Sequence, residues 1–305
     1  MSAPVATRSP LVSVIIPAYN SAAFVLQAVQ SALDQTYGNY EVIVVDDGST
    51  DDTKLVLSRF DGQFRYLYQP NRGLSAARNA GIALAKGDFV CFLDADDLWA
   101  PDKVELQVAY MERHRDIALL STGYEHFTDD GAVAPPLYAV APPGETAART
   151  FTSRDDFVKF VSANFIFVST VMVRKDCFDK SGLFDTNLRA AEDRDMWLRI
   201  SAHFDIACLP PILVRKRNHS LNMSKDRTRQ IRSRIQVLEK NRALFPELAP
   251  SSAWDKQLGK LYLRTAYDSL SRDQSKEARR AALRSLRYYP SIKAAVLVLA
   301  TCTAR

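Results

Sequence analysis

Between residues 11 and 93, short apolar runs alternate with segments of helical periodicity, and this alternation limits the fold more than any other feature of the chain. The runs predict strands at 11–16, 41–45, 64–68 and 88–93, separated by helices at 22–35, 52–59 and 75–85. Strands joined by crossover helices form a largely parallel sheet with helices on its faces. The predicted fold is therefore α/β, with a central, mostly parallel, Rossmann-like sheet flanked by helices.

The middle of the chain is less regular. Residues 129–150 are rich in Pro and Gly and show no periodicity, so they predict a long loop. The other elements expected here are a helix from Pro101, a strand at 165–173, a helix at 195–203, and a strand at 206–214 interrupted by Pro210 and Pro211.

The C-terminal segment differs in periodicity and in charge. Apolar residues from Ile231 to Leu286 recur at helical spacing, which predicts a small helical subdomain. Residues 225–305 hold 18 Lys and Arg and 7 Asp and Glu, a net charge of +11, whereas the rest holds 22 basic and 28 acidic residues, a net charge of −6. We therefore divide the chain into a domain of residues 1–224 and a basic helical subdomain of residues 225–305.

Composition also indicates the compartment. Widely spaced cysteines without a CxxC pair occur at Cys91, Cys177, Cys208 and Cys302. Their apolar surroundings predict buried thiols in a reducing cytosol. The apolar run at 11–16 is too short for a signal peptide, and the run at 294–300 is shorter than the roughly 18 residues of a membrane span. We expect a cytoplasmic protein.

Three polar segments follow predicted strands. In open α/β sheets the ligand lies beyond the carboxyl ends of the strands, so 17–20, 46–49 and 94–97 are expected to converge there. The run Asp94-Ala95-Asp96-Asp97 places three carboxylates within four residues, and Mg²⁺ or Mn²⁺ would relieve their repulsion. The alternative is that these acids cap the helix from Pro101.

The other two segments also have two interpretations each. Asp46 and Asp47 precede Gly48, and a carboxylate there accepts a hydrogen bond either from a nucleotide base or from the N-terminus of the next helix. Tyr19 either stacks on a base or covers the edge of the sheet. Arg78, on the helix at 75–85, is expected to point to the same edge, where a guanidinium neutralises a diphosphate.

As a set, VSVIIPAYN, VIVVDDGSTDDT, NRGLSAARNAGI and FLDADD resemble the successive donor-site motifs of the family 2 glycosyltransferases, over about 90 residues. The resemblance implies a GT-A fold. It implies that Tyr19 and Asp47 hold the base, that Arg78 approaches the diphosphate, and that Asp94 and Asp96 form a DXD motif around ribose and metal. The nucleotide-sugar-binding residues that it implies are Pro17, Tyr19, Asn20, Asp46, Asp47, Arg78, Asp94, Ala95, Asp96, Asp97 and Glu192.

Later motifs continue the resemblance. GLFD at 182–185 and EDRDMWLR at 192–199 are similar to the ED signature of the family, which implies that Asp193 is the catalytic base. Without the earlier motifs, Glu192 and Asp193 would read as ordinary acids at a helix N-terminus. Arg217-Asn218-His219 resembles the family's Arg-x-His, which implies that His219 joins Asp94 and Asp96 at the metal; Lys216 replaces the aromatic that commonly precedes this motif.

The activity implied is inverting transfer of a sugar from a nucleotide diphosphate sugar, with UDP as the default nucleotide and Mn²⁺ or Mg²⁺ as cofactor. Residues 10–100 would hold the donor and residues 101–224 the acceptor. The acceptor would be a saccharide or a lipid-linked hydroxyl in cell-envelope or exopolysaccharide synthesis. A non-catalytic nucleotide-sugar-binding module is the alternative. A dinucleotide-dependent oxidoreductase is disfavoured, because Pro17-Ala18-Tyr19-Asn20 stands where G-x-G-x-x-G is required.

The basic tail has its own alternatives. Between residues 279 and 289, Arg279, Arg280, Arg284 and Arg287 alternate with Leu283, Leu286, Tyr288 and Tyr289. This pattern suits a helix lying on anionic lipid, and therefore peripheral contact with the cytoplasmic face of a membrane. It equally suits a solvated face on a helix packed against the catalytic domain. Binding to nucleic acid is disfavoured.

Overall fold

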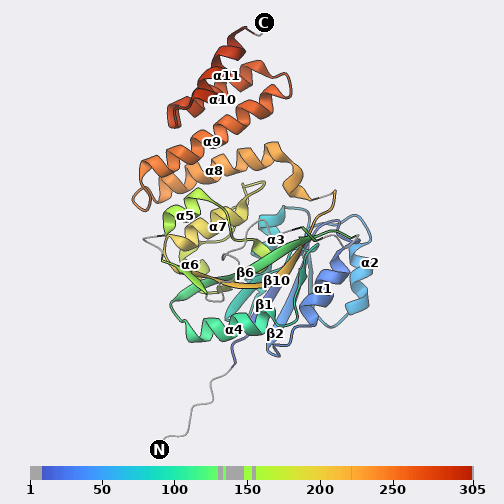
Figure 1. The fold of residues 1–305 in the computed structure, drawn as a ribbon. Helices are drawn as coiled ribbons and strands as arrows, with labels where there is room; N and C mark the ends of the chain where they lie inside the picture. The colour runs from blue at the N-terminus through green and yellow to red at the C-terminus, as the bar shows by residue number, and fades with distance from the viewer. Residues whose placement is uncertain (1–8, 130–132, 135–147, 153–155, 221, 304–305) are drawn as a thin grey trace, which may run out of the picture. The chain divides into compact units, whose positions relative to one another are not determined.

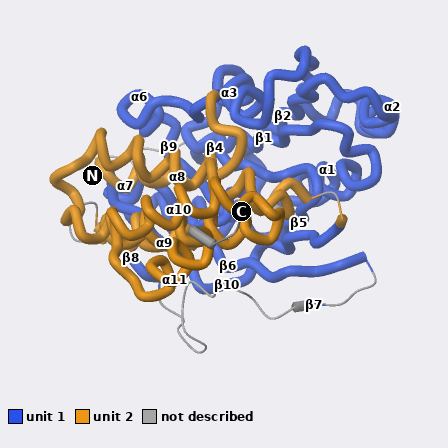
Figure 2. The backbone as a smooth tube through the Cα atoms, turned by 90° about the horizontal axis from the view of Figure 1, so that it is seen from above, with its two compact units in different colours: residues 1–150, 166–186, 204–219 blue, residues 151–165, 187–203, 220–305 orange. Residues whose placement is uncertain are grey.

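The computed structural model describes residues 9–129, 133–134, 148–152, 156–220 and 222–303 (Figure 1). The chain forms two compact units (Figure 2). Unit 1 comprises residues 1–150, 166–186 and 204–219, and unit 2 comprises residues 151–165, 187–203 and 220–305. This grouping differs from the division at residue 224, because two internal segments belong to the same unit as the C-terminal helices.

Unit 1 is built on one sheet. Its strands are β1 (Val12–Ala18), β2 (Tyr40–Asp46), β3 (Arg65–Tyr68), β4 (Phe89–Phe92), β5 (Leu98–Trp99), β6 (Ile117–Phe127), β7 (Val133–Ala134), β9 (Met172–Arg174) and β10 (Asp205–Arg217). The order is β3-β2-β1-β4-β9-β6-β10-β5, with β7 pairing β6. Strands β3, β2, β1 and β4 are parallel neighbours, and β6 is parallel to β10, whereas β9 and β5 run antiparallel to their neighbours. The predicted α/β sheet is confirmed, and its first half is wholly parallel.

Helices cover both faces of this sheet. Those of unit 1 are α1 (Val25–Leu33), α2 (Thr53–Leu57), α3 (Leu74–Leu84), α4 (Lys103–Arg113) and α6 (Cys177–Ser181). Val14 and Ile16 of β1 belong to a buried core shared with α1 and α4. Ile15 points to the opposite face, where α3 approaches so closely that a Cβ on Gly81 would lie 2.4 Å from its Cγ2 atom. Glycine at position 81 therefore allows α3 to pack on β1.

The four strands and three helices predicted between residues 11 and 93 are all present, with ends that differ by a few residues. The strand predicted at 165–173 is wrong in part, because residues 168–170 form a 3₁₀ helix and only β9 follows. Strand β6 was not predicted. Strand β10 continues through Pro210 and Pro211, since a register shift between Cys208 and Ile212 takes the prolines, which lack N–H donors, out of the regular ladder.

Two other predictions concern the loop and the thiols. Most of the loop predicted at 129–150 lies outside the described residues, and residues 133–134 and 149–150 belong to β7 and to β8 (Arg149–Phe151). Cys91, Cys177 and Cys208 are buried free thiols, as predicted, and burial raises the pKa of each. The side chain of Cys302 lies outside the described residues.

Unit 2 is helical. Its helices are α5 (Phe157–Ser162), α7 (Glu192–Ser201), α8 (Arg227–Leu244), α9 (Ser251–Leu270), α10 (Ser275–Tyr288) and α11 (Ile292–Thr303). Helices α8 to α11 follow one another as packed neighbours, which confirms the predicted helical tail (Figure 1). The helix predicted at 195–203 begins three residues earlier, at Glu192. No helix within the described ranges is both long and apolar enough to cross a membrane.

A buried ionic network joins α7 to α8. Asp195 is fully buried, and its carboxylate accepts hydrogen bonds from Arg199 Nε at 3.0 Å, Lys240 Nζ at 3.0 Å and Asn241 Nδ2 at 2.9 Å. Arg199 lies in the last turn of α7, whereas Lys240 and Asn241 belong to α8. A buried carboxylate requires such partners, because its desolvation cost is several kcal/mol. The network therefore fixes α7 against the first helix of the tail.

We expect Asp195→Ala to lower the free energy of unfolding of the chain by about 3 kcal/mol, because it leaves Arg199 and Asn241 buried without their common acceptor. Urea denaturation followed by circular dichroism measures the change. Glu247→Ala is the matched control, since Glu247 is an exposed acid of the same unit. Equal stability of the two variants would show that the network contributes nothing.

Candidate functional site

The carboxyl ends of β2, β1 and β4 lie side by side at one edge of the sheet, since the three strands are parallel neighbours. The loops that follow β1 and β2 are joined there by hydrogen bonds. Asn20 N donates to Ser49 Oγ at 2.9 Å, and Thr50 N donates to Asn20 Oδ1 at 2.8 Å. Asn20 adopts φ 48°, a left-handed conformation that asparagine tolerates. The structure thus brings the two loops together as the strand pattern predicted.

Asp46 and Asp47 close the end of β2 and are both buried. The Asp46 carboxylate accepts from Ser49 N at 2.8 Å and from Tyr66 Oη at 2.6 Å. Burial and this bond to Asp46 raise the pKa of Tyr66, which keeps the phenol protonated as a donor. Asp46 therefore holds the loop after β2 and the neighbouring strand β3 in place, and its predicted part in nucleotide-sugar binding stays a prediction.

The Asp47 carboxylate organises the segment before α3. It accepts from Gln69 Nε2 at 2.6 Å, from Arg72 N at 3.0 Å and from Gly73 N at 2.8 Å. A carboxylate offers about four acceptor positions, and these bonds use three of them. Tyr19, at the end of β1, is half-exposed, as a stacking platform requires. Base binding by Tyr19 and Asp47 stays a prediction.

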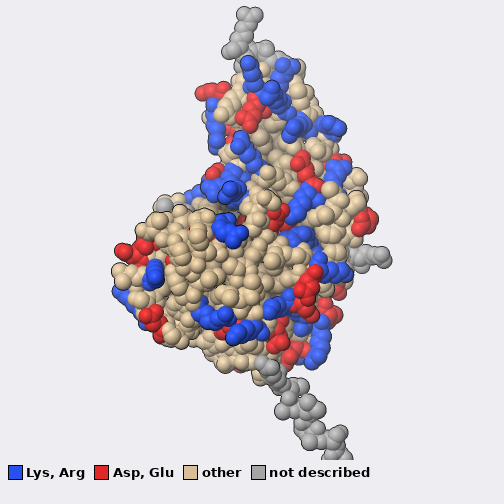
Figure 3. Space-filling view, turned by 180° about the vertical axis from the view of Figure 1, so that it is seen from behind, with Lys and Arg blue, Asp and Glu red and all other residues tan. Residues whose placement is uncertain are grey.

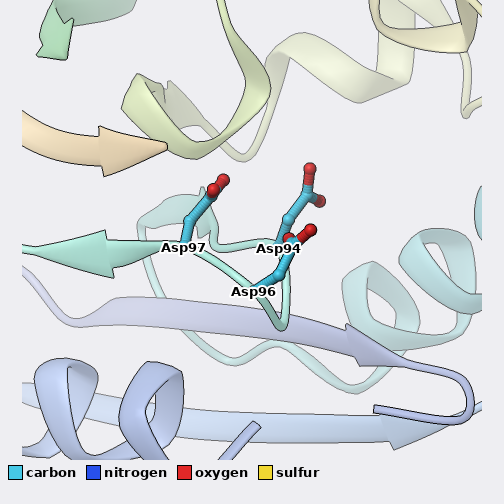
Figure 4. A group of neighbouring side chains, drawn as sticks. All are labelled: Asp94, Asp96 and Asp97. Atoms are coloured by element: carbon cyan, nitrogen blue, oxygen red, sulfur yellow. The ribbon is translucent and has the colours of Figure 1, made fainter. Parts of the chain in front are cut away.

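The acidic run forms a compact cluster at the turn after β4. Oxygen atoms of Asp94, Asp96 and Asp97 lie within 4.8 Å of one another, and their side chains project to the same side of the turn (Figure 4). Ala95, between them, is buried. The buried guanidinium of Arg78 donates to Asp94 Oδ1 at 2.7 Å. Arg78 therefore reaches the predicted edge, where it orients a carboxylate of the cluster.

Asp97 is the most buried acid of the cluster. Its Oδ2 atom accepts from Ser169 Oγ at 2.6 Å, and its Oδ1 atom accepts from Arg217 N at 3.1 Å. Burial first, and then the charges of Asp96 and Asp94, raise its pKa well above the ordinary value. Ser169 also accepts from Asp94 N at 3.1 Å, so it positions both ends of the acidic turn. Asp97 is therefore held inside the protein by these bonds, whereas the carboxylates of Asp94 and Asp96 are partly exposed.

Asp96 is paired with the histidine predicted for the metal. His219 Nε2 lies 2.9 Å from Asp96 Oδ2, and its ring packs 4.3 Å from the ring of Phe24. Burial, followed by repulsion from Asp94, raises the pKa of Asp96, and His219 opposes this rise. Arg217 Nε donates to the Asp96 carbonyl at 3.0 Å. Arg217 and His219, the outer residues of the motif Arg217-Asn218-His219, therefore both contact the acidic turn.

The residues present fit a divalent cation. Asp94 and Asp96 supply partly exposed carboxylates, and His219 supplies an imidazole beside one of them. Oxygen ligands with one imidazole suit Mn²⁺ and Mg²⁺. Three carboxylates this close repel one another, and a cation relieves that repulsion. The sequence did not indicate Ser169, and it indicated Arg217 only as part of the Arg-x-His motif. Both residues come from segments far from the acidic run.

Glu192 and Asp193 begin α7 in unit 2. Ala191, the N-cap residue of the helix, adopts φ 57°, a left-handed conformation unusual for alanine. The Asp193 carboxylate accepts from Arg194 N at 2.7 Å and from Asn164 Nδ2 at 3.3 Å, whereas Glu192 is buried. Asn164, which the sequence did not single out, thus positions the predicted base. The role of Asp193 itself stays a prediction.

Comparisons with known proteins agree with the site motifs. A family model described as glycosyl transferase family 2 matches residues 13–182. An uncharacterized glycosyltransferase of Rickettsia prowazekii is 33% identical over 226 residues, which cover 73% of this chain and 69% of the relative. Another, of Rickettsia felis, is 36% identical over 193 residues, 63% of this chain but only 30% of the relative. A putative teichuronic acid biosynthesis glycosyltransferase, TuaG of Bacillus subtilis, is 41% identical over 126 residues, 40% of this chain and 50% of that relative.

Solved structures share the fold. S. aureus TarS 1–349, in complex with UDP-GlcNAc, has a TM-score of 0.68 at 19% identity, covering 95% of this chain and 90% of the other. The mannosyltransferase PcManGT of Pyrobaculum calidifontis, in complex with GDP-Man and Mn²⁺, has a TM-score of 0.61 at 21% identity, covering 99% and 82%. At these identities the likeness shows the fold alone, and it confirms the predicted GT-A architecture with C-terminal helices.

Proposed function

The chain belongs to glycosyl transferase family 2, and we propose that it transfers a sugar from a nucleotide diphosphate sugar to a hydroxyl group of an acceptor, with inversion at the anomeric carbon. The observation that carries this proposal is the cluster of Asp94, Asp96 and Asp97, oriented by Arg78 and joined by His219 at the carboxyl edge of the sheet. A cluster that would hold a cation at this edge suits a ligand with negatively charged phosphates.

We assign nucleoside binding, metal binding and proton transfer to different residues of the chain. Tyr19 and Asp47 lie where the β1 and β2 loops meet and would hold the nucleoside. Asp94, Asp96 and His219 would bind Mn²⁺ or Mg²⁺, which supplies positive charge against the leaving diphosphate. An acceptor hydroxyl has a pKa far above neutrality, so a carboxylate must take its proton as the oxygen attacks. We assign that step to Asp193, held by Asn164 and by its own helix N-terminus.

For the donor we propose a UDP-linked sugar, and for the acceptor a saccharide or a lipid-linked saccharide of a cell-envelope polymer. Support comes from TuaG, whose name assigns it to teichuronic acid biosynthesis, and from the TarS complex with UDP-GlcNAc. The PcManGT complex with GDP-Man shows that the shared fold also accepts another nucleotide, so GDP sugars belong in the test.

Thermal shift across a panel of UDP and GDP sugars, each with Mn²⁺ and with EDTA, tests the donor. We expect one donor with Mn²⁺ to raise the melting temperature by about 5 °C at saturating concentration, because a ligand that binds only the folded state stabilises it by mass action. Slow release of the nucleoside diphosphate from that donor would then show turnover. Binding without any release, with every acceptor tried, would favour a non-catalytic nucleotide-sugar-binding module; no shift with any donor would contradict the proposal.

A further inference from the structure

The last helix of unit 2 exposes an apolar stripe. Ile292, Val296 and Leu299 lie at i, i+4 and i+7 of α11, and they are 84%, 57% and 69% exposed. The opposite face of the same helix buries Ala294 and Leu297 against its neighbours. Large aliphatic side chains on one helical face are costly to leave in water, at about 25 cal/mol per Å² of apolar area. The exposed aliphatic area therefore favours contact of this face with another apolar surface.

The last two helices are rich in exposed cations and lack acids beyond the first turn of α10. Residues 278–305 contain six Lys and Arg and no Asp or Glu. Helix α10 buries small residues such as Ala278 and Ala282, while Arg279, Arg280 and Arg287 on its other face are exposed. Tyr289 and Lys293, at the turn between α10 and α11, are exposed as well. Figure 3 shows several Lys and Arg side chains, with fewer Asp and Glu, on the face that the C-terminal helices present in its upper part.

Charge decides between the occupants that could cover the stripe. A second copy of the chain would pair like patches across a two-fold axis and bring Arg287 and Lys293 against the same cations. An anionic lipid surface turns that repulsion into attraction, worth about 1 kcal/mol for each Lys or Arg near the headgroups. A short helix with aliphatic residues on one side and cations beside them matches the chemistry of the interface between headgroups and acyl chains.

We propose that the exposed stripe of α11 and the adjoining cations of α10 form a docking surface for an anionic membrane. Ile292 and Val296 would enter the interface at the helix start, and Arg279, Arg280 and Arg287 would contact lipid phosphates. The inference concerns unit 2 alone and needs no donor, so it stands independently of the proposed transfer reaction. A lipid-linked acceptor of the proposed class would lie in the same membrane to which the chain docks.

Co-sedimentation of the full chain with vesicles tests the surface. The vesicles are phosphatidylcholine alone, or phosphatidylcholine with about one-third phosphatidylglycerol. We expect binding to the anionic vesicles that weakens as salt is added, because salt screens the attraction. The triple variant Ile292→Ser, Val296→Ser, Leu299→Ser should lose at least about tenfold in partition coefficient, because it removes the aliphatic anchor. Neutralising Arg279, Arg280 and Arg287 with glutamine should lose about fivefold per residue on anionic vesicles.

The matched control changes an exposed leucine and an exposed arginine elsewhere. Leu55→Ser with Arg59→Gln makes such a pair of substitutions in unit 1 and should leave binding unchanged. Wild-type chain that stays in the supernatant with both vesicles, or variants that bind like the wild type, would overturn the proposal. Concentration-dependent dimerisation that the triple serine variant abolishes, without vesicle binding, would overturn it in favour of a second copy. Donor binding by thermal shift is measured separately, so failure here is distinguishable from failure of the transferase assignment.

Discussion

Asp193→Asn is expected to lower kcat for sugar transfer by about a thousandfold, the size of effect associated with loss of a general base. Asparagine has nearly the same shape and keeps an oxygen that accepts from Arg194 N, so α7 should begin as it does in the wild type. What it cannot do is take the proton of the acceptor hydroxyl. The donor touches other residues in this proposal, so KM for the donor should change little.

Steady-state kinetics on the donor found by thermal shift, with acceptor at saturation, measures the change. Glu247→Gln serves as the control, because it removes an exposed acid of the same unit. Asn164→Ala gives a finer test, since loss of its hydrogen bond to Asp193 should lower kcat, but by less than Asp193→Asn does. Normal turnover by Asp193→Asn, with donor binding intact, would remove Asp193 from the mechanism.

The sequence predicts the first half of the sheet well, because β1, β2 and β4 are largely buried and appear as mostly apolar runs, broken only by Ser13 in β1 and by Glu41 in β2. The same logic failed at β6, whose Ser121, Thr122 and Gly123 interrupt the apolar pattern although the strand is almost wholly buried. It failed also at 165–173, where Ser169 and Thr170 turn in a 3₁₀ helix. Ser121 donates to Cys208 and Ser169 donates to Asp97, and no local pattern indicates such contacts between distant segments.

The candidate site shows the same limit at the level of side chains. Spacing alone places Asp94, Asp96 and Asp97 at one strand end, and the structure brings their oxygens together. Spacing does not say that Ser169 would join Asp94 to Asp97, or that Arg78 would be used to orient a carboxylate. These contacts depend on the packing of segments far apart in the chain, so only the folded structure reveals them.

Helix α8 supports α7, a role that its basic composition does not indicate. The charge of the tail suggests a separate module, whereas Lys240 and Asn241 complete the buried environment of Asp195 on α7. Asp193 begins the same helix, so α8 helps to hold the residue that we propose as the base. Removing the chain after Ser224 would therefore disturb α7 directly. Substitutions on the exposed faces of α10 and α11 leave α8 unchanged, so they test the proposed membrane contact separately from the support of α7.

Asp96→Ala is expected to abolish the Mn²⁺-dependent part of activity, lowering kcat/KM by about a hundredfold or more at a Mn²⁺ concentration that saturates the wild type. Asp96 combines a partly exposed carboxylate with the contact to His219, so its loss would remove one of the proposed ligands and release the imidazole of another. His219→Ala should weaken Mn²⁺ binding by a smaller factor. Asp102→Ala, an exposed acid a few residues along the chain, is the control and should behave as wild type.

The pH dependence of stability tests the same cluster without any turnover. Burial and mutual repulsion raise the pKa of Asp96 and Asp97 in the folded chain. The native state then holds these protons more tightly than the unfolded state, so without metal their contribution should lower stability as pH rises through that window. With Mn²⁺ bound the charged form is favoured, and the metal-dependent gain in melting temperature should grow over the same window, since protons compete with the ion. A gain that is independent of pH, or that survives in Asp96→Ala, would place the ion elsewhere and leave the acidic turn with the role of a helix cap.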